Sequence, residues 1–276
     1  MSGRIPTPEE RAARALQRAP KEGHYRLRML VAYEGGAFRG WQSQATGDAV
    51  QDHLERAFQQ VVGRRVIVHG AGRTDAGVHA LGQVAHADVP EEFLTPRRWL
   101  LALNANLPRE ARVVRATKAH ASFHSQYDAE GKIYTYRIWN ASFLHPLLIG
   151  RAWHVPTAID LDALRQAAKV LEGTHDFASF AANRGKPETD TVRTIHGIEV
   201  HARGAAITLR FQGNGFLYRM VRLLTGSMIR TAQGRMESGW LESLLAAPGV
   251  RKTKHLAPAE GLYLTRVIYP RGAATE

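Results

Sequence analysis

The sequence predicts an α+β protein made of two ferredoxin-like halves, whose largely antiparallel strands form a central sheet and leave a cleft between the halves. Two observations carry this prediction. Short segments with apolar residues at every second position alternate with longer segments that have apolar residues at helical spacing. Over residues 25–116 these segments follow the order β-α-β-β-α-β, which is typical of a ferredoxin-like unit. Similar segments recur, less regularly, over residues 132–269.

The first half contains six predicted elements. A helix is expected from Val50 to Val61, with Asp48 as its N-cap and Gly63 just past its end. A second helix is expected to start at Thr95 and Pro96, because proline favours the first turn of a helix. Strands are predicted from alternating or β-branched apolar residues at 25–33, 65–69, 81–87 and 111–116.

The second half is predicted in the same way. Helices are expected at 161–171, 216–231 and 241–246, and strands at 132–139, 192–201, 206–212 and 262–269. The two strands around Gly204 form a hairpin. The predicted domains are therefore a poorly ordered basic N-terminal arm at 1–24, a first half at 25–130 and a second half at 131–276.

The composition restricts the classes of function. Among its 276 residues the chain has 37 Lys and Arg against 25 Asp and Glu, a net charge of +12 and a sequence pI of about 10.3. Such an excess of positive charge favours a polyanionic partner such as a nucleic acid. The chain has no cysteine, which excludes disulfides, thiolate metal sites and a cysteine nucleophile and fits a cytoplasmic location. No apolar run suggests a signal peptide or a membrane span.

A glycine-rich segment, Gly70–His79, is expected to form a tight loop between two strands. It lacks the Gly-Lys-Ser/Thr ending of a phosphate-binding P-loop and the glycine spacing of a dinucleotide-binding loop. These exclusions leave a loop that displays Arg73, Thr74 and Asp75. From the pattern alone, a turn with a solvated aspartate explains the loop equally well.

The thirteen histidines raise the question of a metal site. Asp75, His79, His86 and Asp88 are close in the sequence, but no His-Glu-x-x-His or similar pair occurs. Isolated histidines usually pack or lie at the surface. No functional metal is therefore expected.

Five parts of the chain together resemble one known family. Arg73–Ala80, with the sequence RTDAGVHA, looks like the catalytic motif of the tRNA pseudouridine synthase A family. Further motifs of this family are similar to Phe123–Tyr136, His175–Phe180 with Thr191–Ile195, Gly213–Arg222 and Ala257–Leu264. The similarity extends from about residue 26 to residue 270, so that only the N-terminal arm lies outside it.

The resemblance implies roles for individual residues. Asp75 matches the family's nucleophile, which attacks either C1′ of the sugar or the uracil ring. Arg222 matches the arginine that the family places beside that carboxylate. A helical wheel also allows Arg222 to be solvated, and it leaves Arg219 as a competing partner of the carboxylate. Arg219 is further expected to contact the substrate. Tyr134 matches the tyrosine that lies against the base, with Tyr136 as the alternative. Arg73 matches an arginine that fills the space left by the flipped base.

The resemblance also implies a substrate and an assembly. Members of the family isomerise uridine to pseudouridine at positions 38, 39 and 40 of the tRNA anticodon stem-loop, act as homodimers and use no cofactor. The reaction includes no redox step, which agrees with the lack of a cofactor motif. Two other classes remain as alternatives: a non-catalytic RNA-binding module, which gives Asp75 no role, and a metal-dependent RNA hydrolase, which needs several converging acids or histidines.

Overall fold

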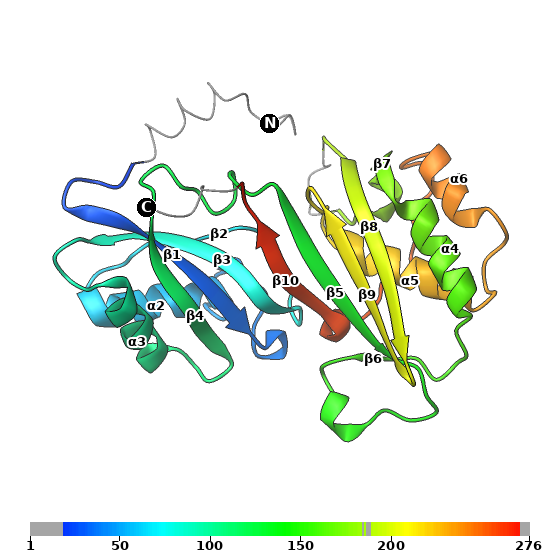
Figure 1. The fold of residues 1–276 in the computed structure, drawn as a ribbon, viewed down its shortest axis with the longest axis horizontal. Coiled ribbons are helices and arrows are strands. Elements are labelled where there is room, and N and C mark those ends of the chain that lie inside the picture. The colour runs from blue at the N-terminus through cyan, green and yellow to red at the C-terminus, as the bar shows by residue number, and fades with distance from the viewer. Residues whose placement is uncertain (1–18, 184, 186–188, 271–276) are drawn as a thin grey trace. The chain divides into compact units, whose positions relative to one another are not determined.

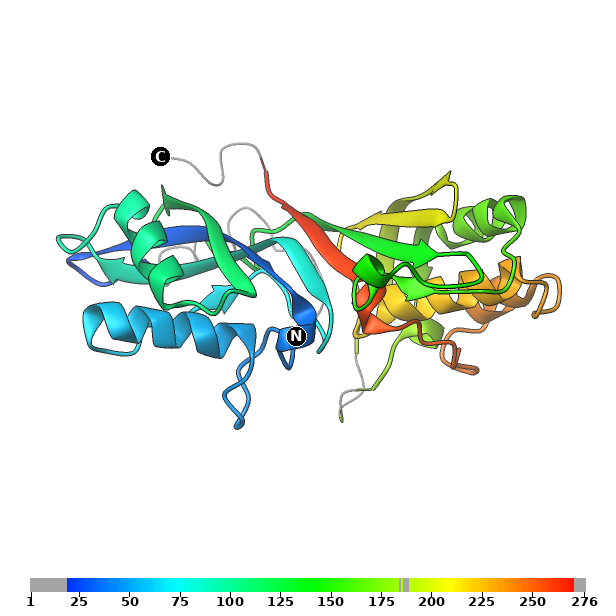
Figure 2. The same ribbon diagram turned by 90° about the horizontal axis from the view of Figure 1, so that it is seen from below.

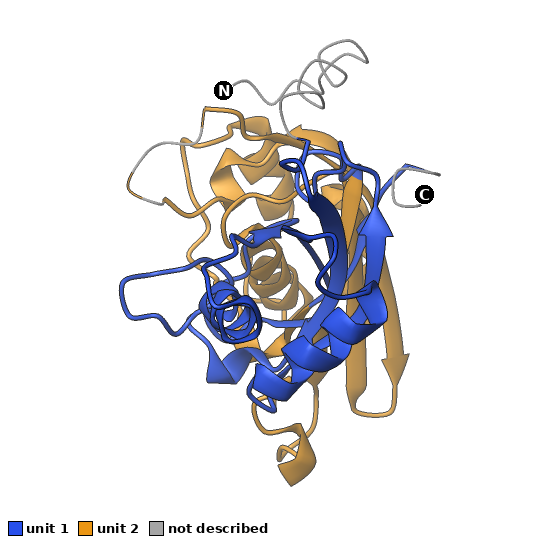
Figure 3. Ribbon diagram, turned by 90° about the vertical axis from the view of Figure 1, so that its left-hand side faces the viewer, with its two compact units in different colours: residues 1, 3–130, 264–276 blue, residues 2, 131–263 orange. Residues whose placement is uncertain are grey.

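The structure is a computed structural model that describes residues 19–183, 185 and 189–270. These residues form two compact units (Figure 3). The first unit contains residues 19–130 together with 264–270, and the second contains residues 131–263. Most of the predicted N-terminal arm, residues 1–18, lies outside the described residues.

The first unit carries the predicted β-α-β-β-α-β order, which is confirmed (Figure 1). Its strands are hydrogen-bonded in the order β4-β1-β3-β10, with β2 beside β3, and the pairs that β1 forms with β3 and β4 are antiparallel. The elements are β1 (His24–Tyr33), the 3-10 helix η1 (Gly35–Ala37), α2 (Val50–Val62), β2 (His69–Gly70), β3 (His79–Pro90), α3 (Pro96–Asn106), β4 (Ala111–Ala119) and, from Leu264 on, β10 (Leu262–Ile268).

The second unit has strands in the order β5-β9-β8-β7, with the short β6 parallel to β5. Its other strand pairs are antiparallel. The elements are β5 (Gly131–Trp139), η2 (Pro146–Leu148), β6 (Trp153–His154), α4 (Leu161–Leu171), β7 (Gly173–Asp176), η3 (Ala178–Phe180), β8 (Val192–Arg203), β9 (Ala206–Gly213), α5 (Met220–Ala232), α6 (Trp240–Ala246) and η4 (Ala259–Gly261).

Two predictions at the start of the chain are wrong in detail. The N-cap of α2 is Ala49 and not Asp48, and the carboxylate of Asp52 accepts the backbone N–H of Ala49 at 3.0 Å. The strand expected at 65–69 is reduced to His69–Gly70, because the backbone of residues 65–68 pairs with no neighbouring strand.

Two further differences concern the second half. Helix α5 begins at Met220 rather than at Phe216, because Arg219 has a left-handed backbone with φ of +60° and ends the preceding loop. The last strand belongs to the first unit from Leu264 on, although the prediction assigned all residues after 130 to the second half. The short strands β6 and β7 were not predicted.

Each unit has its own core beneath helices that pack on its strands (Figures 1 and 2). In the first unit, α2 and α3 pack on each other and α3 packs on β4. In the second unit, α4 packs on α5 and on β8. Fully buried side chains that fill these cores include Leu27, Phe58, Trp99 and Leu103 in the first unit, and Leu164, Leu209, Phe211, Leu224 and Met228 in the second. Among the described residues, no helix is long and apolar enough to cross a membrane.

Candidate active site

The loop Gly70–His79, which we call the Asp75 loop, displays its two charged residues in different ways. The side chain of Arg73 is exposed, Asp75 is half-buried, and Thr74 between them is buried. Two backbone hydrogen bonds hold the turn, from the N–H of Val78 to the carbonyl of Asp75 at 3.1 Å and from the N–H of Trp41 to the carbonyl of Thr74 at 3.1 Å. The backbone on both sides of Asp75 is therefore fixed.

A buried pair of hydroxyl groups anchors the Asp75 loop to strand β1. The hydroxyls of Tyr33 and Thr74 share a hydrogen bond of 2.8 Å, across 41 positions of sequence. Burial raises the pKa of Tyr33 to about 12, so that its hydroxyl stays protonated. The side chain of Gln83 adds a second anchor, because its Nε2 donates to the carbonyl of Gly72 at 2.8 Å.

Neighbouring glycines allow the backbone to approach the loop closely. A Cβ atom on Gly40, where φ is +86°, would lie 2.6 Å from the carbonyl oxygen of Thr74. A Cβ atom on Gly35 would lie 2.2 Å from the carbonyl oxygen of Val78. Gly77 turns the chain with φ of +81°. A larger residue at Gly35 or Gly40 would therefore collide with the backbone of the Asp75 loop and displace it.

Tyr134 lies on β5 in the second unit. The residue is 7% exposed, and its ring contacts the ring of Phe216 edge to face, with centroids 5.3 Å apart. Tyr136, on the same face, is fully buried and donates its hydroxyl proton to the carbonyl of Pro258 at 2.7 Å. Because Tyr136 is buried and its hydroxyl is used by Pro258, its geometry agrees with a structural role. Tyr134 therefore stays the candidate for contact with the target base.

Arg222 lies on α5 and is half-buried, so it is not on the solvated face that the helical wheel allowed. Its Nε donates to the carbonyl of Ala257 at 2.8 Å, while the N–H of Ala257 donates to the carbonyl of Arg222 at 3.1 Å. Burial raises the pKa of Tyr136 well above its usual value, and the positive charge of Arg222 partly opposes this rise. The segment Ala257–Gly261 therefore supports both Arg222 and Tyr136.

Arg219 differs from Arg222 in every respect that bears on the active site. It is exposed, it lies outside α5, and its guanidinium stacks 4.9 Å from the centre of the Tyr218 ring. An exposed guanidinium on an aromatic ring suits contact with RNA, whereas Arg222 is fixed by its hydrogen bond to Ala257. The substrate-contact role of Arg219 stays a prediction.

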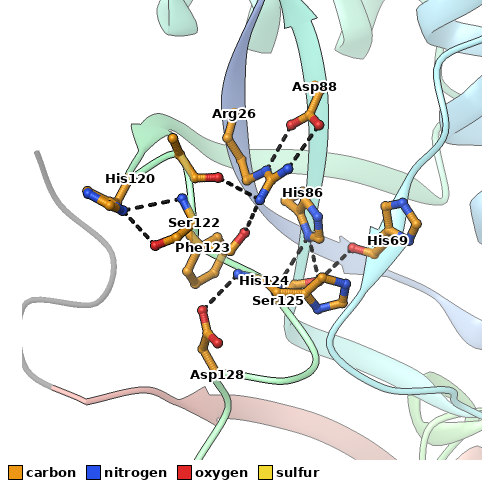
Figure 4. A network of polar contacts seen from close by, with 11 residues as sticks. Arg26, His69, His86, Asp88, His120, Ser122, Phe123, His124, Ser125 and Asp128 are labelled. Atoms are coloured by element: carbon orange, nitrogen blue, oxygen red, sulfur yellow. Dashed lines mark hydrogen bonds and ion pairs between the residues drawn. The ribbon is translucent and has the colours of Figure 1, made fainter. Parts of the chain in front are cut away.

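The residues considered for a metal site do not converge in the first unit. The Nδ1 of His79 accepts the N–H of Gly35 at 3.0 Å, and Asp88 forms a bidentate pair with the buried Arg26 at 2.8 and 2.9 Å. His86 accepts the N–H of Ser125 at 3.2 Å (Figure 4). In the part of the chain that the structure describes, no group of three or more His, Cys, Asp or Glu could hold a metal ion.

The same network of hydrogen bonds holds the first residues of the segment Phe123–Tyr136 in place. Arg26 also donates to the carbonyls of Ala121 and Phe123, at 2.8 and 2.7 Å (Figure 4). Ser125 donates its hydroxyl proton to the carbonyl of His69 at 2.8 Å. The start of this segment is therefore an anchor of the first unit, and its end carries Tyr134 in the second.

Comparison with known proteins identifies the family. The sequence profile of a family described as tRNA pseudouridine synthase matches residues 29–128 and 167–270. A tRNA pseudouridine synthase A of Akkermansia muciniphila is 46% identical over 252 residues, covering 89% of this chain and 95% of that protein. One of Geobacillus kaustophilus is 41% identical over 249 residues, covering 88% and 94%. The chain belongs to the tRNA pseudouridine synthase family and is an isomerase, which leaves no support for the non-catalytic module or the RNA hydrolase.

A solved structure, a Cbf5–Nop10–Gar1 complex, aligns with 74% of this chain and 45% of its own at 12% identity, with a TM-score of 0.34. This likeness is too low to carry an argument.

The predicted site residues lie in both units, Arg73 and Asp75 in the first and Tyr134, Arg219 and Arg222 in the second. Sequence reasoning missed the residues that support them, above all Tyr33 and Ala257.

Proposed function

We propose that this protein converts uridine to pseudouridine in the tRNA anticodon stem-loop, at positions 38, 39 and 40, with Asp75 as the nucleophile. The observation that carries this proposal is the Asp75 loop itself. A half-buried carboxylate stands on a backbone that is fixed from both sides and anchored by the buried pair of Tyr33 and Thr74. A nucleophile held in this way loses little freedom when it attacks.

The other candidate residues have complementary roles in this proposal. Arg222 orients the carboxylate of Asp75, because a guanidinium binds a carboxylate through charged hydrogen bonds of fixed geometry. Tyr134 lies against the uracil, and its phenol assists removal of the proton from C5. Arg73, exposed two residues before Asp75, takes the place of the flipped base, and Arg219 contacts the RNA backbone.

The test uses tRNA that carries tritium at C5 of uridine, incubated in EDTA. Formation of pseudouridine replaces the C5 hydrogen, so release of tritium into water measures turnover. We expect release by the wild-type protein to survive the chelator and to fall by at least about 10^4-fold in Asp75→Asn, since the amide cannot act as the nucleophile. The matched control is Asp48→Asn, which removes an exposed carboxylate of the same unit.

Two outcomes would contradict the proposal. Turnover that persists in Asp75→Asn would remove Asp75 from the role of nucleophile. Cleavage of the RNA strand instead of tritium release would favour a hydrolase. Mapping the product by position then decides whether the modified uridines lie in the anticodon stem-loop.

We further propose that the protein acts on tRNA as a homodimer in the cytoplasm, without a cofactor. The support is the similarity over nearly the whole length of its relatives, and the net charge of +12 fits a polyanionic substrate. Sedimentation should give the mass of a dimer at micromolar concentration. A monomer under these conditions would contradict the dimer without affecting the proposed reaction.

A further inference from the structure

A pair of basic side chains in the second unit has no role in the proposed chemistry. Lys132 precedes Tyr134 by two residues on β5, so both side chains point to the same face of the sheet. Its side chain is half-buried. In the part of the chain described here, no hydrogen bond or ion pair joins its amine to a protein group. A lysine in such a position usually has a partner.

The neighbouring strands bring a second cation to the same place. Lys132 lies opposite Gly213 of β9, and Gly213 lies opposite Ile195 of β8. Arg193 precedes Ile195 by two residues and so shares its face of the sheet. Gly213 has no side chain, and a Cβ atom there would lie 2.8 Å from the carbonyl oxygen of Thr194 and 3.1 Å from the ring of Phe216, so this ring packs directly against the strand.

The charges of this cluster do not balance. Arg193 lies 3.5 Å from the carboxylate of Asp190, with both side chains largely buried at 20% and 28% exposed. Among the described residues, the cluster thus contains two bases and one acid, which pairs with Arg193. Burial, followed by the positive charge of Arg193, lowers the pKa of Lys132 to about 8. Two adjacent half-buried cations with one carboxylate have room for one more negative charge.

We propose that Lys132 and Arg193 bind a phosphodiester group of the RNA, next to the uridine whose base lies against Tyr134. This inference rests on the proposed function, because it places the phosphate beside the proposed base site. The single charge of a phosphodiester balances the cluster, and Lys and Arg are the usual partners of phosphate oxygens. Phe216 links the two parts, since its ring contacts that of Tyr134 and lies over Gly213.

The cluster differs from an ordinary solvated charge. Lys169 on α4, in the same unit, is 72% exposed and pairs with Glu172 at 3.0 Å, which is typical of surface lysines. Lys132 is less exposed and, among the residues that the structure describes, has no such partner. A negative ligand that arrives with the substrate removes the repulsion between Lys132 and Arg193.

The experiment measures binding of an anticodon stem-loop RNA in an Asp75→Asn background, where no turnover disturbs the equilibrium. We expect Lys132→Met to weaken binding about tenfold, the effect of losing one charged hydrogen bond. The slope of log K against log salt should become shallower by about 0.7 to 0.9. Lys132→Arg should retain most of the affinity. Lys169→Met removes the same charge from the same unit and should change neither quantity.

A second arm identifies the contact on the RNA. Each phosphate near the target uridine is replaced in turn by an uncharged methylphosphonate. At one position the replacement should weaken binding to the Asp75→Asn protein but not to its Lys132→Met derivative, because the partner is already lost. A thermal midpoint of Lys132→Met at or above that of the parent protein shows that the loss of binding does not reflect unfolding.

The proposal is overturned if Lys132→Met binds as tightly as the parent protein, or if every methylphosphonate weakens both proteins equally. Either result leaves the proposed reaction intact as long as the wild-type protein releases tritium. Conversely, if the wild-type protein releases no tritium but the coupled loss of binding is found, the phosphate site stands and the proposed reaction fails.

Discussion

The two regions that carry the candidate residues are built on different principles. In the first unit, Asp75 stands on a loop that is held by backbone hydrogen bonds, close glycine contacts and one buried hydroxyl pair. In the second unit, Tyr134 and Arg222 stand on a strand and a helix, and their positions follow from how these elements pack. A loop can be displaced by the loss of one contact, whereas a residue on a helix moves only when the helix or its support moves. The following substitutions test this difference.

The largest effect after that of Asp75 is expected at Arg222. Replacing it with Met removes the positive charge that we assign to the nucleophile while leaving α5 intact, so kcat should fall roughly 10^2- to 10^3-fold. Tritium release at saturating tRNA measures this loss. Arg230→Met, on the same helix, is the matched control and should retain near wild-type kcat. A normal kcat in Arg222→Met would show that Arg222 supplies no charge to the nucleophile.

The next substitution tests the support of the helix. A Cβ atom on Gly226 would lie 1.9 Å from the carbonyl oxygen of His255, so Gly226→Ala must displace the segment that leads to Ala257. We expect the free energy of unfolding to fall by about 1–3 kcal/mol, as in other overpacked cores, and kcat to fall because Arg222 loses its anchor.

Denaturant titration and tritium release measure the two consequences of Gly226→Ala. Gly197→Ala is the control, since a Cβ atom there would meet nothing closer than 3.9 Å. Equal stability of the two variants would contradict the close packing of α5 on this segment.

In the first unit, the corresponding test is Tyr33→Phe. It removes the hydroxyl that anchors Thr74 and should lower the unfolding free energy by about 1–3 kcal/mol. Because Thr74 directly precedes Asp75, kcat should also fall, by roughly tenfold, with little change in KM.

Tyr25→Phe provides a matched control for Tyr33→Phe. Tyr25 lies on the same strand, is 6% exposed and donates to the carbonyl of Leu94 at 2.9 Å, far in sequence from the Asp75 loop. It should lose stability but keep its kcat. If both variants lose kcat to the same extent, the hydroxyl of Tyr33 supports the fold and does not position the loop.

The smallest expected effect concerns Lys132 and has the opposite sign. A lysine whose pKa falls from 10.5 to about 8 on folding destabilises the folded protein at neutral pH. Between pH 8 and 10.5 the unfolded chain binds the proton more strongly, so the stability of the wild-type protein rises with pH through this window. Lys132→Met should lack that rise and be more stable at pH 7 by about 1–2 kcal/mol, less than the full shift because the side chain is partly exposed.

Denaturant titrations of the wild-type protein and Lys132→Met at pH 7 and pH 10 test this prediction. The difference in unfolding free energy between the two proteins at each pH isolates the contribution of Lys132 from that of other groups that titrate between these pH values. Lower stability of Lys132→Met at pH 7 would mean that the amine already has a favourable partner in the folded protein.

The sequence was most informative where structure depends on local periodicity. Helix α4 spans the predicted residues 161–171, and the element order of the first unit is as expected. The prediction failed at the start of α5, because Phe216 and Leu217 follow the apolar spacing of the helix but the left-handed backbone of Arg219 interrupts it. Periodicity also cannot tell which strand another will pair with, and residues 264–268 of β10 therefore fall in the first unit although they were expected in the second half.

The candidate site shows the same limit. Motifs that resemble the family predict Asp75, Tyr134 and Arg222 as site residues, because each lies in a run of characteristic residues. They do not identify the groups that hold these residues. The support for Thr74 comes from a hydroxyl 41 positions away, and that for Arg222 from the backbone carbonyl of Ala257. A backbone carbonyl is present at every residue, so no sequence pattern marks the one that is used.

The position of β10 in the chain affects the order in which the protein can fold during synthesis. Leu264–Ile268 complete the first unit but are translated after the whole second unit. Until they leave the ribosome, the part of β3 around Gly82, which later fits against the carbonyl of Thr265, has no strand on that side. Residues 131–263 are continuous and can finish their own sheet first. The half that is synthesised first, which carries Asp75, is therefore the half that is completed last, and its open strand edge needs protection from wrong pairing in the meantime.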